Sequence, residues 1–226
     1  MEESVKLIAL TKPVADDMLD FSVQDFIGYV ARVSNPGNQL NTETTEKLLK
    51  YLLKNKHYSP FEMVNVVMEI NTTRDIPIQI LRHRSFSFQE FSQRYANPTV
   101  DLGFTAKEAR LQDKKNRQNS IENSDLELNN EWQFRQLQLV ELAKTNYKWA
   151  VDHGLAKEVA RVVLPEGLTN SRLYMNGSLR SWIHYCLLRM GNGTQKEHRE
   201  IALECWNVLC EKFEFLKIIE LEDTQH

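Results

Sequence analysis

The segment 82–94 concentrates side chains that bind anions. It contains three arginines, three serines and one histidine, namely Arg82, His83, Arg84, Ser85, Ser87, Ser92 and Arg94. Guanidinium groups supply paired donors that match phosphate oxygens, and serine hydroxyls add short neutral donors beside them. The segment therefore indicates a site for a phosphomonoester or a pyrophosphate.

An extended conformation of 84–94 would gather several of these side chains on one face, because alternate residues of a strand point the same way. That face would carry Arg84, Glu90, Ser92 and Arg94. Glu90 would then lie among cations, where its carboxylate could anchor an arginine or accept a hydrogen bond from a sugar hydroxyl. On composition alone, an exposed strand with internal ion pairs and no ligand is the alternative.

The order of the residues resembles a known family. RHR at 82–84, followed by seven residues and Ser92, resembles the motif of the flavin-dependent thymidylate synthases. The agreement continues upstream in 57–62, which reads HYSPFE, and downstream in 90–95, which reads EFSQRY.

The C-terminal half carries two further points of resemblance, ARVVLP at 160–165 and the stretch 179–189. Both place an arginine, Arg161 or Arg189, among apolar residues. An unpaired buried guanidinium is costly, so each of the two should meet an anion, a carbonyl or a carboxylate.

The resemblance implies an activity. It predicts conversion of dUMP to dTMP, with 5,10-methylenetetrahydrofolate as the one-carbon donor and NADPH as the reductant of bound FAD. The cofactor carries most of such chemistry, so the protein has to align the flavin with the pyrimidine and stabilise charge on the uracil ring. The family also implies a homotetramer whose sites lie between subunits.

The resemblance also assigns residues. It gives to the flavin Ser34, His57, Ser59, Arg82, His83, Arg84, Ser178, Arg180 and His184. It gives to the nucleotide Gln79, Arg82, Glu90, Ser92, Gln93, Arg94, Arg161 and Arg189. Arg189 would face the uracil ring and favour ionisation at N3, which makes it the candidate catalytic residue. No metal is expected.

Covalent catalysis is the competing chemistry. Ser92 has no general base beside it in the sequence, so we interpret it as a ligand contact rather than a nucleophile. Cys186, Cys205 and Cys210 lack metal-ligand spacing and lie in apolar helical sequence, which predicts buried thiols. Among the three, only Cys186 stands close to a histidine, His184.

The charge, hydropathy and motif content of the sequence argue against several classes of function. The 226 residues carry a net charge of -3, so no overall basic field would hold a nucleic-acid polymer. The first 25 residues contain no apolar run suited to a signal peptide or membrane span, which predicts a cytoplasmic protein. Neither GxGxxG nor GxxxxGK[ST] occurs, so a dinucleotide must bind outside a Rossmann or P-loop frame.

The elements that would hold these residues are of mixed type. Apolar periodicity predicts helices at 23–33, 42–55, 131–152, about 156–164, 179–190 and 195–213, and strands at 63–70 and 173–178. Asp75 is expected to cap a short helix containing Pro77, and Gly191 to Gly193 to cap a helix C-terminus.

These elements predict an α+β fold, a single domain over 1–226 with a largely antiparallel sheet and surrounding helices. The polar, Asn-rich stretch at about 101–130 is expected to be a surface insertion, either a solvated loop or a frayed helix. Two other functions stay open from the sequence: a nucleotide enzyme with the arginine-serine site but no flavin, and a catalytically inactive binding or assembly protein.

Overall fold

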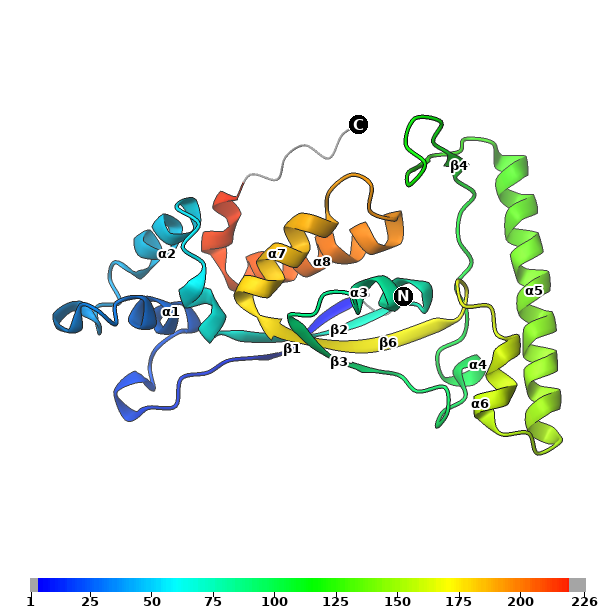
Figure 1. Ribbon diagram of the computed structural model, residues 1–226, viewed down its shortest axis with the longest axis horizontal. Coiled ribbons are helices and arrows are strands. Elements are labelled where there is room, and N and C mark those ends of the chain that lie inside the picture. The colour runs from blue at the N-terminus through cyan, green and yellow to red at the C-terminus, as the bar shows by residue number, and fades with distance from the viewer. Residues whose placement is uncertain (1–3, 220–226) are drawn as a thin grey trace.

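A four-stranded antiparallel sheet forms the centre of the molecule in the computed structural model, which describes residues 4–219. Its strands run in the order β1-β2-β6-β3 (Figure 1). They are β1 (Val5–Leu10), β2 (Asn65–Thr73), β6 (Asn170–Ser178) and β3 (Phe86–Glu90). This confirms the predicted α+β class with an antiparallel sheet.

The central strand pair places one face of the sheet in the core. Every residue of β2 pairs with one of β6, from Asn65 opposite Ser178 to Thr73 opposite Asn170. Alternate β2 residues, Val66, Met68 and Ile70, are fully buried. Period-two burial of branched and long apolar side chains is what a half-covered sheet requires.

Two helices, α7 (Leu179–Arg189) and α8 (Lys196–Lys212), cover the buried face, as Figure 1 shows. Trp182 of α7 is fully buried, and its indole N–H donates to the carbonyl of Val66 at 3.0 Å. Ser178 ends β6 and caps α7, because its hydroxyl accepts from the backbone N–H of Ser181. Strand and helix are thus joined without a loop.

The start of β3 is fixed by a close approach of Phe86 to Gly177. A Cβ atom on Gly177 would lie 2.4 Å from the Phe86 ring, so only glycine fits at that position. The Phe86 ring also meets Trp182 edge-on, with centroids 5.0 Å apart. The preceding segment 82–84 lies against the C-terminal half of α7, where the His83 ring packs on Tyr185.

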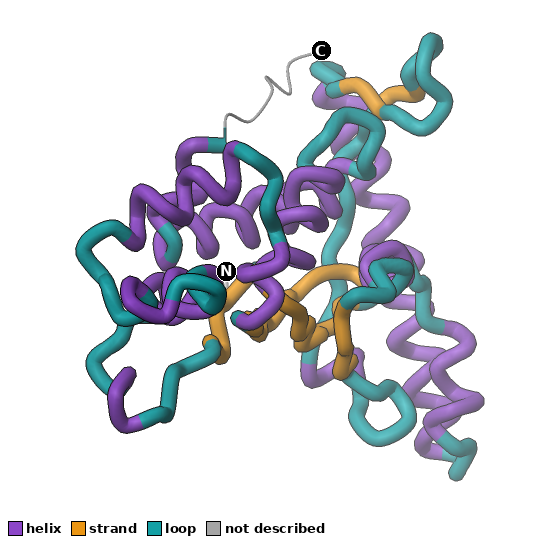
Figure 2. The backbone as a smooth tube through the Cα atoms, turned by 60° about the vertical axis from the view of Figure 1, so that its left-hand side comes forward, coloured by secondary structure: helices purple, strands orange, loops and turns teal. Residues whose placement is uncertain are grey.

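The other helices lie at the two ends of the sheet (Figures 1 and 2). At one end are α1 (Val23–Ala31) and α2 (Thr45–Lys54), and Ser22 and Asp25 form a capping box at the start of α1. At the other end are α4 (Pro98–Asp101), α6 (Lys157–Ala160) and the long helix α5 (Leu126–Asp152). All the predicted long helices are present, with ends shifted by a few residues.

The polar insertion is more ordered than predicted. It contains a small hairpin of β4 (Leu111–Gln112) and β5 (Ser120–Ile121), and α5 begins at Leu126 rather than at 131. Asp125 accepts a hydrogen bond from the backbone N–H of Leu128 at 3.0 Å and so caps the helix. The loop or frayed helix expected up to 130 is therefore wrong for its last five positions.

Other expectations need correction in the sheet. β1 was not predicted, β2 continues past 70 to Thr73, and β6 begins at Asn170 rather than at 173. The extended stretch expected over 84–94 is a strand only from Phe86 to Glu90. Phe91 still donates its backbone N–H to the carbonyl of Arg172, after which the chain turns, so Ser92 and Arg94 leave the strand face.

Two capping predictions were wrong. The short helix α3 (Asp75–Ile80) is present, but Asp75 is its first residue and not its cap, because Arg74 already has helical dihedral angles. The carboxylate of Asp75 instead accepts from the hydroxyl of Thr73 at 2.6 Å. Helix α7 ends at Arg189 with Met190 as its C-cap, and the residue with a positive φ of 95° is Gly193, in the loop that follows.

Candidate active site

An open pocket of about 490 Å³ lies between the end of α2, the 3-10 turn Ser59–Met63 and the start of α7. It is lined by Ala31, Leu52, Lys56, His57, Tyr58, Ser59, Pro60 and Arg180. Three of the predicted flavin residues, His57, Ser59 and Arg180, are thus brought together from segments more than a hundred positions apart. The volume falls in the range typical of ligand sites.

The other predicted flavin residues do not line this pocket. The ring of His184, on the exposed side of α7, meets the ring of Tyr58 edge-on with centroids 4.8 Å apart. Arg180 forms an ion pair with Glu62. Ser178 is engaged as the cap of α7, and Ser34 is exposed after α1 and does not line the pocket.

A larger hollow of about 800 Å³ lies at the start of α5 and is shallow. Its lining is Asp125, Glu127, Leu128, Asn130, Glu131 and Phe134. Three carboxylates and no cation make it unsuited to an anionic nucleotide or cofactor.

The 82–84 loop contacts the candidate catalytic arginine. Arg189, at the end of α7, donates from Nε to Nε2 of His83 at 2.8 Å. The His83 ring also packs edge-on against Tyr185, with centroids 4.9 Å apart. Arg189 thus meets an imidazole nitrogen, which is not one of the anion, carbonyl or carboxylate partners expected for it.

The hydrogen bond requires a neutral His83. Burial and, secondly, the positive charge of Arg189 lower the pKa of His83 below its usual 6.5. Nε2 can therefore accept at neutral pH, and Nη1 and Nη2 of the guanidinium keep their own N–H donors for a ligand. His83 orients Arg189 without adding a second positive charge.

Arg82 and Arg84 flank this pair and are exposed. Within residues 4–219, neither guanidinium has a carboxylate within ion-pair distance. Paired donors without an acidic partner suit a diphosphate or another anion.

Gln79 lies one turn before this loop, in a network of side chains that the sequence did not predict. Its Nε2 donates to Oε1 of Gln195 at 2.7 Å, and its Oε1 lies 3.3 Å from Nδ1 of His198. Nε2 of His198 lies 3.2 Å from the hydroxyl of Tyr185. His198 is fully buried, so it takes no part in direct ligand contact; it connects Gln79 to the ring that packs on His83.

We expect His198 to make folding acid-sensitive. Burial, followed by the charges of Arg189 and His83, lowers the pKa of His198 to about 3. The unfolded chain therefore binds one more proton than the folded chain between about pH 6.5 and pH 3, so this contribution is complete above pH 6.5 and is lost as the pH falls towards 3. The slope is up to about 1.4 kcal/mol per pH unit.

Replacing His198 with Asn should flatten the fall in the free energy of unfolding between pH 6.5 and pH 4.5, measured by urea denaturation at each pH. His153→Asn, a change at an exposed histidine that follows α5, is the matched control and should leave the slope as in the parent. Equal slopes for His198→Asn and the parent would contradict the assignment of His198 as a buried neutral group.

The far end of β3 holds the carboxylate predicted to contact the nucleotide. Glu90 accepts from the hydroxyl of the buried Ser171 at 2.7 Å and pairs with Arg74 at 3.3 Å. Of the two roles left open for Glu90, anchoring an arginine is therefore present, although Arg74 was not among the predicted residues. Within residues 4–219, Oε2 of Glu90 has no hydrogen-bond partner and can still accept from a ligand.

The residues after β3 dock against α6. Arg94 forms an ion pair with Glu158 at 3.1 Å, and Lys157 donates to the carbonyl of Tyr95 at 2.8 Å. Arg161 follows Glu158 by three residues and begins the 3-10 turn Arg161–Val163, directly after α6. The structure thus brings Arg94 and Arg161 to one junction.

Two polar groups at this end of the sheet lack protein partners within residues 4–219. The guanidinium of Arg161 is half-buried and makes no hydrogen bond or ion pair there, so the anion, carbonyl or carboxylate expected for it is not provided by this part of the chain. Nε2 of Gln93 is buried with no acceptor, while the residue is 5% exposed. Unsatisfied buried donors are rare in folded proteins and indicate a further partner.

The chain is similar to known proteins over most of its length. Residues 18–213 match the family described as thymidylate synthase complementing protein. The chain is 49% identical over 212 residues to the flavin-dependent thymidylate synthase of Synechocystis sp. strain PCC 6803, covering 92% of this chain and 95% of that protein. The chain belongs to the flavin-dependent thymidylate synthases.

Two more comparisons agree with this family. A probable flavin-dependent thymidylate synthase of Paramecium bursaria Chlorella virus 1 is 44% identical over 210 residues, which is 93% of this chain and 95% of the viral protein. A crystal structure of the UMP/dUMP methylase PolB from Streptomyces cacaoi, bound with 5-Br dUMP, has the same fold, with a TM-score of 0.76 and 24% identity over 95% of this chain and 94% of that one. The protein is accordingly a methyltransferase of the flavin-dependent thymidylate synthase family.

Cysteine chemistry does not fit the arrangement found in this flavin-dependent thymidylate synthase. Cys186 and Cys205 are fully buried and Cys210 is half-buried, which confirms buried thiols for two of the three. Burial raises the pKa of all three, and that of Cys186 well above its usual value. A buried neutral thiol is a poor nucleophile, so Cys186 lacks the activation that covalent attack on a pyrimidine would need.

Among the helices of residues 4–219, none is long and apolar enough to cross a membrane. Within the same described part of the chain, no group of three or more His, Cys, Asp or Glu side chains is placed to hold a metal ion.

Proposed function

We propose that the protein converts dUMP to dTMP, with FAD bound in the pocket at the start of α7, 5,10-methylenetetrahydrofolate as one-carbon donor and NADPH as reductant. The observation that carries this proposal is the hydrogen bond from Arg189 to His83. It joins the 82–94 motif to an arginine more than a hundred positions away. The three cysteine thiols all have raised pKa values, so none of them is an activated nucleophile, which suits chemistry supplied by a cofactor.

The donor chemistry of the pocket fits a flavin dinucleotide. Lys56, His57, Ser59 and Arg180 line it, and Arg82 and Arg84 stand without acidic partners in the described chain. We assign to the cofactor Ser34, His57, Ser59, Arg82, His83, Arg84, Ser178, Arg180 and His184. Arg180 would have to share its ion pair with Glu62 when an anion binds. When bound, the flavin supplies the redox chemistry that completes the methyl group.

The nucleotide site would combine side chains beside the 82–84 loop with side chains at the opposite end of β3. We assign to it Gln79, Arg82, Glu90, Ser92, Gln93, Arg94, Arg161 and Arg189. Support comes from the unpartnered guanidinium of Arg161 and the buried, unpartnered amide nitrogen of Gln93. A nucleotide monophosphate offers both an anion for the first and carbonyl or hydroxyl acceptors for the second.

Arg189 would act on the uracil ring. His83 occupies only its Nε–H, so the N–H groups of Nη1 and Nη2 can donate to ring carbonyl oxygens. A fixed positive charge there stabilises the uracil anion formed when N3 loses its proton, and it favours that ionisation. The neutral state of His83 leaves Arg189 as the cation of the pair.

We also propose that the protein is a homotetramer whose sites lie between subunits. Helix α5 stands away from the sheet in Figure 1 and exposes large apolar side chains, among them Trp132, Leu137, Leu142 and Trp149. Such surface is typical of subunit contacts. Light scattering of flavin-loaded protein should give four times the 26.5 kDa monomer mass, and a monomer mass would contradict this part.

The flavin assignment separates the proposal from the two alternatives that the sequence left open. Protein purified with or reconstituted by FAD should be yellow, and its absorbance near the flavin band should bleach on anaerobic addition of NADPH. Protein that FAD cannot reconstitute would favour a nucleotide enzyme without flavin. Bound flavin that is reduced but supports no methyl transfer would favour a binding or assembly role.

A further inference from the structure

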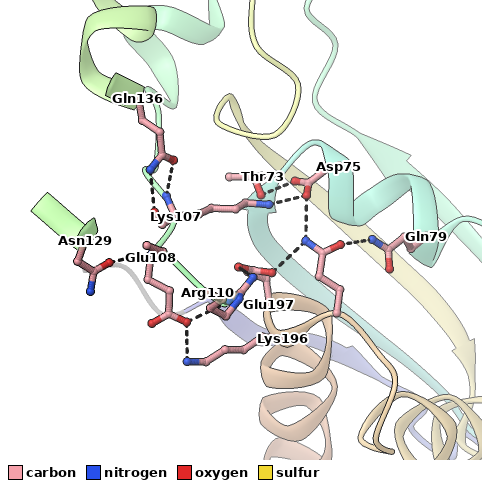
Figure 3. A network of polar contacts seen from close by, with 12 residues as sticks. Thr73, Asp75, Gln79, Lys107, Glu108, Arg110, Asn129, Gln136, Lys196 and Glu197 are labelled. Carbon is pink, nitrogen blue, oxygen red and sulfur yellow. Dashed lines mark hydrogen bonds and ion pairs between the residues drawn. The ribbon is translucent and has the colours of Figure 1, made fainter. Parts of the chain in front are cut away.

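The polar insertion is connected to the elements around Gln79 by a group of charged pairs, which we name the clasp: Asp75, Lys107, Glu108, Arg110, Lys196 and Glu197. Lys107 pairs with Asp75 of α3, and Arg110 pairs with Glu197 of α8 at 2.7 Å (Figure 3). Glu108 accepts from Lys196 at 2.7 Å and from Arg110 at 3.1 Å. The segment 107–110 thus binds two helices at once.

The principal pairs of the clasp are shielded from solvent. The side chains of Lys107, Asp75, Arg110 and Glu197 are 18%, 26%, 14% and 21% exposed. Burial opposes ionisation of Glu197, but hydrogen bonds from Gln195 and Arg110 lower its pKa overall. Partly buried and networked pairs hold geometry better than isolated surface pairs do.

Helix α5 holds the backbone of the same segment. Gln136, which is 3% exposed, accepts from the N–H of Lys107 and donates to its carbonyl, both at 2.8 Å. Asn129 accepts from the N–H of Ala109 at 2.8 Å. These amides, visible at the left of Figure 3, bind the backbone of the segment to α5, while the side chains of the segment contact α3 and α8.

The clasp determines how the amide of Gln195 is oriented. Its nitrogen donates to Asp75 at 3.2 Å and to Glu197 at 2.9 Å. Two carboxylates can only accept, so the amide nitrogen must face them and the oxygen must point the other way, towards Gln79. The pairing of Lys107 and Arg110 with these carboxylates keeps both in place.

Gln195 in turn orients Gln79. The oxygen of Gln195 accepts from Nε2 of Gln79 at 2.7 Å, so the oxygen of Gln79 faces Nδ1 of His198. His198 then carries its proton on Nδ1 and accepts from Tyr185 on Nε2. Tyr185, His198, Gln79 and Gln195 thus form a hydrogen-bonded relay. In this relay each residue donates to the next, and the last one donates to the clasp carboxylates Asp75 and Glu197. Gln79 keeps one N–H and one oxygen lone pair for a ligand, in a fixed arrangement.

We propose that Lys107 and Arg110 are positioning residues for nucleotide binding that act on Gln79 through this relay. The inference rests on the proposed function, in which Gln79 contacts the nucleotide. The insertion is then part of the substrate site without touching the substrate. Because α5 binds the backbone of the insertion, the position of α5 also affects the affinity for the nucleotide.

The test is the affinity of FAD-loaded protein for dUMP, measured by equilibrium dialysis, beside its affinity for FAD. Lys107→Met and Arg110→Met should each raise the dUMP dissociation constant about tenfold, the effect of losing one well-oriented hydrogen bond. FAD affinity should stay within about twofold, because the pocket at α7 is separate. Lys107→Arg, which keeps the charge, should restore most of the dUMP affinity.

Gln195→Leu supplies a second route that leaves the charged pairs intact. It should weaken dUMP binding to the same extent, and its effect should not add to that of Lys107→Met, because both act through Gln79. If Lys107→Met did not fold, Gln195→Leu would carry the same expectation. Arg117→Met, at an exposed position of the same insertion, is the matched control and should bind dUMP as the parent does.

The outcomes separate this inference from the proposed function. A parent protein that binds no dUMP would overturn the proposed function and this inference with it. A parent that binds dUMP, together with clasp variants that bind it within about twofold of the parent, would overturn the positioning role alone. Equal losses of FAD and dUMP affinity in the Lys107 and Arg110 variants would also overturn it, since they would show a general structural effect.

Discussion

Arg189→Lys is expected to lower the turnover number about 10²–10³-fold while FAD and dUMP still bind, the loss typical when one charge-stabilising donor is removed from a site. Arg189 donates from Nε to His83 at 2.8 Å, so the N–H groups of Nη1 and Nη2 remain for the uracil ring. Lysine retains the charge but lacks both the bond to His83 and the paired donors. The measurement is the single-turnover rate of dTMP formation in flavin-loaded protein.

Arg117→Lys, an equivalent change at an exposed arginine, is the control and should turn over as the parent does. A rate for Arg189→Lys within about threefold of the parent would show that the arginine acts by charge alone or does not face the uracil ring. A large rise in the dUMP dissociation constant at unchanged turnover would assign Arg189 to ground-state binding.

Arg161→Met should raise the dUMP dissociation constant about 10- to 100-fold, the range for a lost charge-assisted hydrogen bond. Within residues 4–219 its guanidinium is half-buried and has no partner. A half-buried cation without a counter-charge is unfavourable unless an anion completes the site, and the phosphate is the anion that dUMP brings. Methionine retains the packing of the side chain but not its charge.

Deoxyuridine, which lacks the phosphate, is the internal control for Arg161. Its affinity should be the same for Arg161→Met and the parent, so the loss should be confined to dUMP. Similar losses for dUMP and deoxyuridine would instead indicate that the substitution disturbs α6 and its contact with the segment 92–95. The ion pair between Arg94 and Glu158 makes that contact. The deoxyuridine affinity shows whether the contact is preserved in Arg161→Met.

The sequence was a good guide where the signal was local. Helical periodicity predicted α1, α2, α7 and α8, and an uninterrupted motif in segment 82–94 identified the family. The motif could not show that β3 ends at Glu90. That end depends on the last hydrogen bond to β6, from Phe91 to Arg172, which is a long-range contact.

Non-local pairing also explains what was missed. β1 is an edge strand whose buried and exposed residues do not alternate, so Val5 is buried but Ile8 and Ala9 are exposed, and its pairing with β2 gives no periodic signal. Arg74 becomes a site residue only because β6 places Ser171 and Glu90 beside it.

The relay around Gln79 was also missed because it depends on non-local contacts. Gln195 and His198 lie in an ordinary helical sequence, and only the packing of α8 against α3 and α7 gives them their partners. The insertion was expected to be a surface feature, and its composition gave no indication of a role. Its contacts with Asp75 and Glu197 show that a polar composition alone does not distinguish a solvated loop from a bonded one.

Release of tritium from dUMP labelled at carbon 5 tests the central claim most directly, because the hydrogen at that carbon must leave when a methyl group is attached. With FAD-loaded protein, release should require both NADPH and 5,10-methylenetetrahydrofolate and should be accompanied by an equal amount of dTMP. Protein that binds FAD and is reduced by NADPH, but releases no tritium and forms no dTMP, would contradict the account.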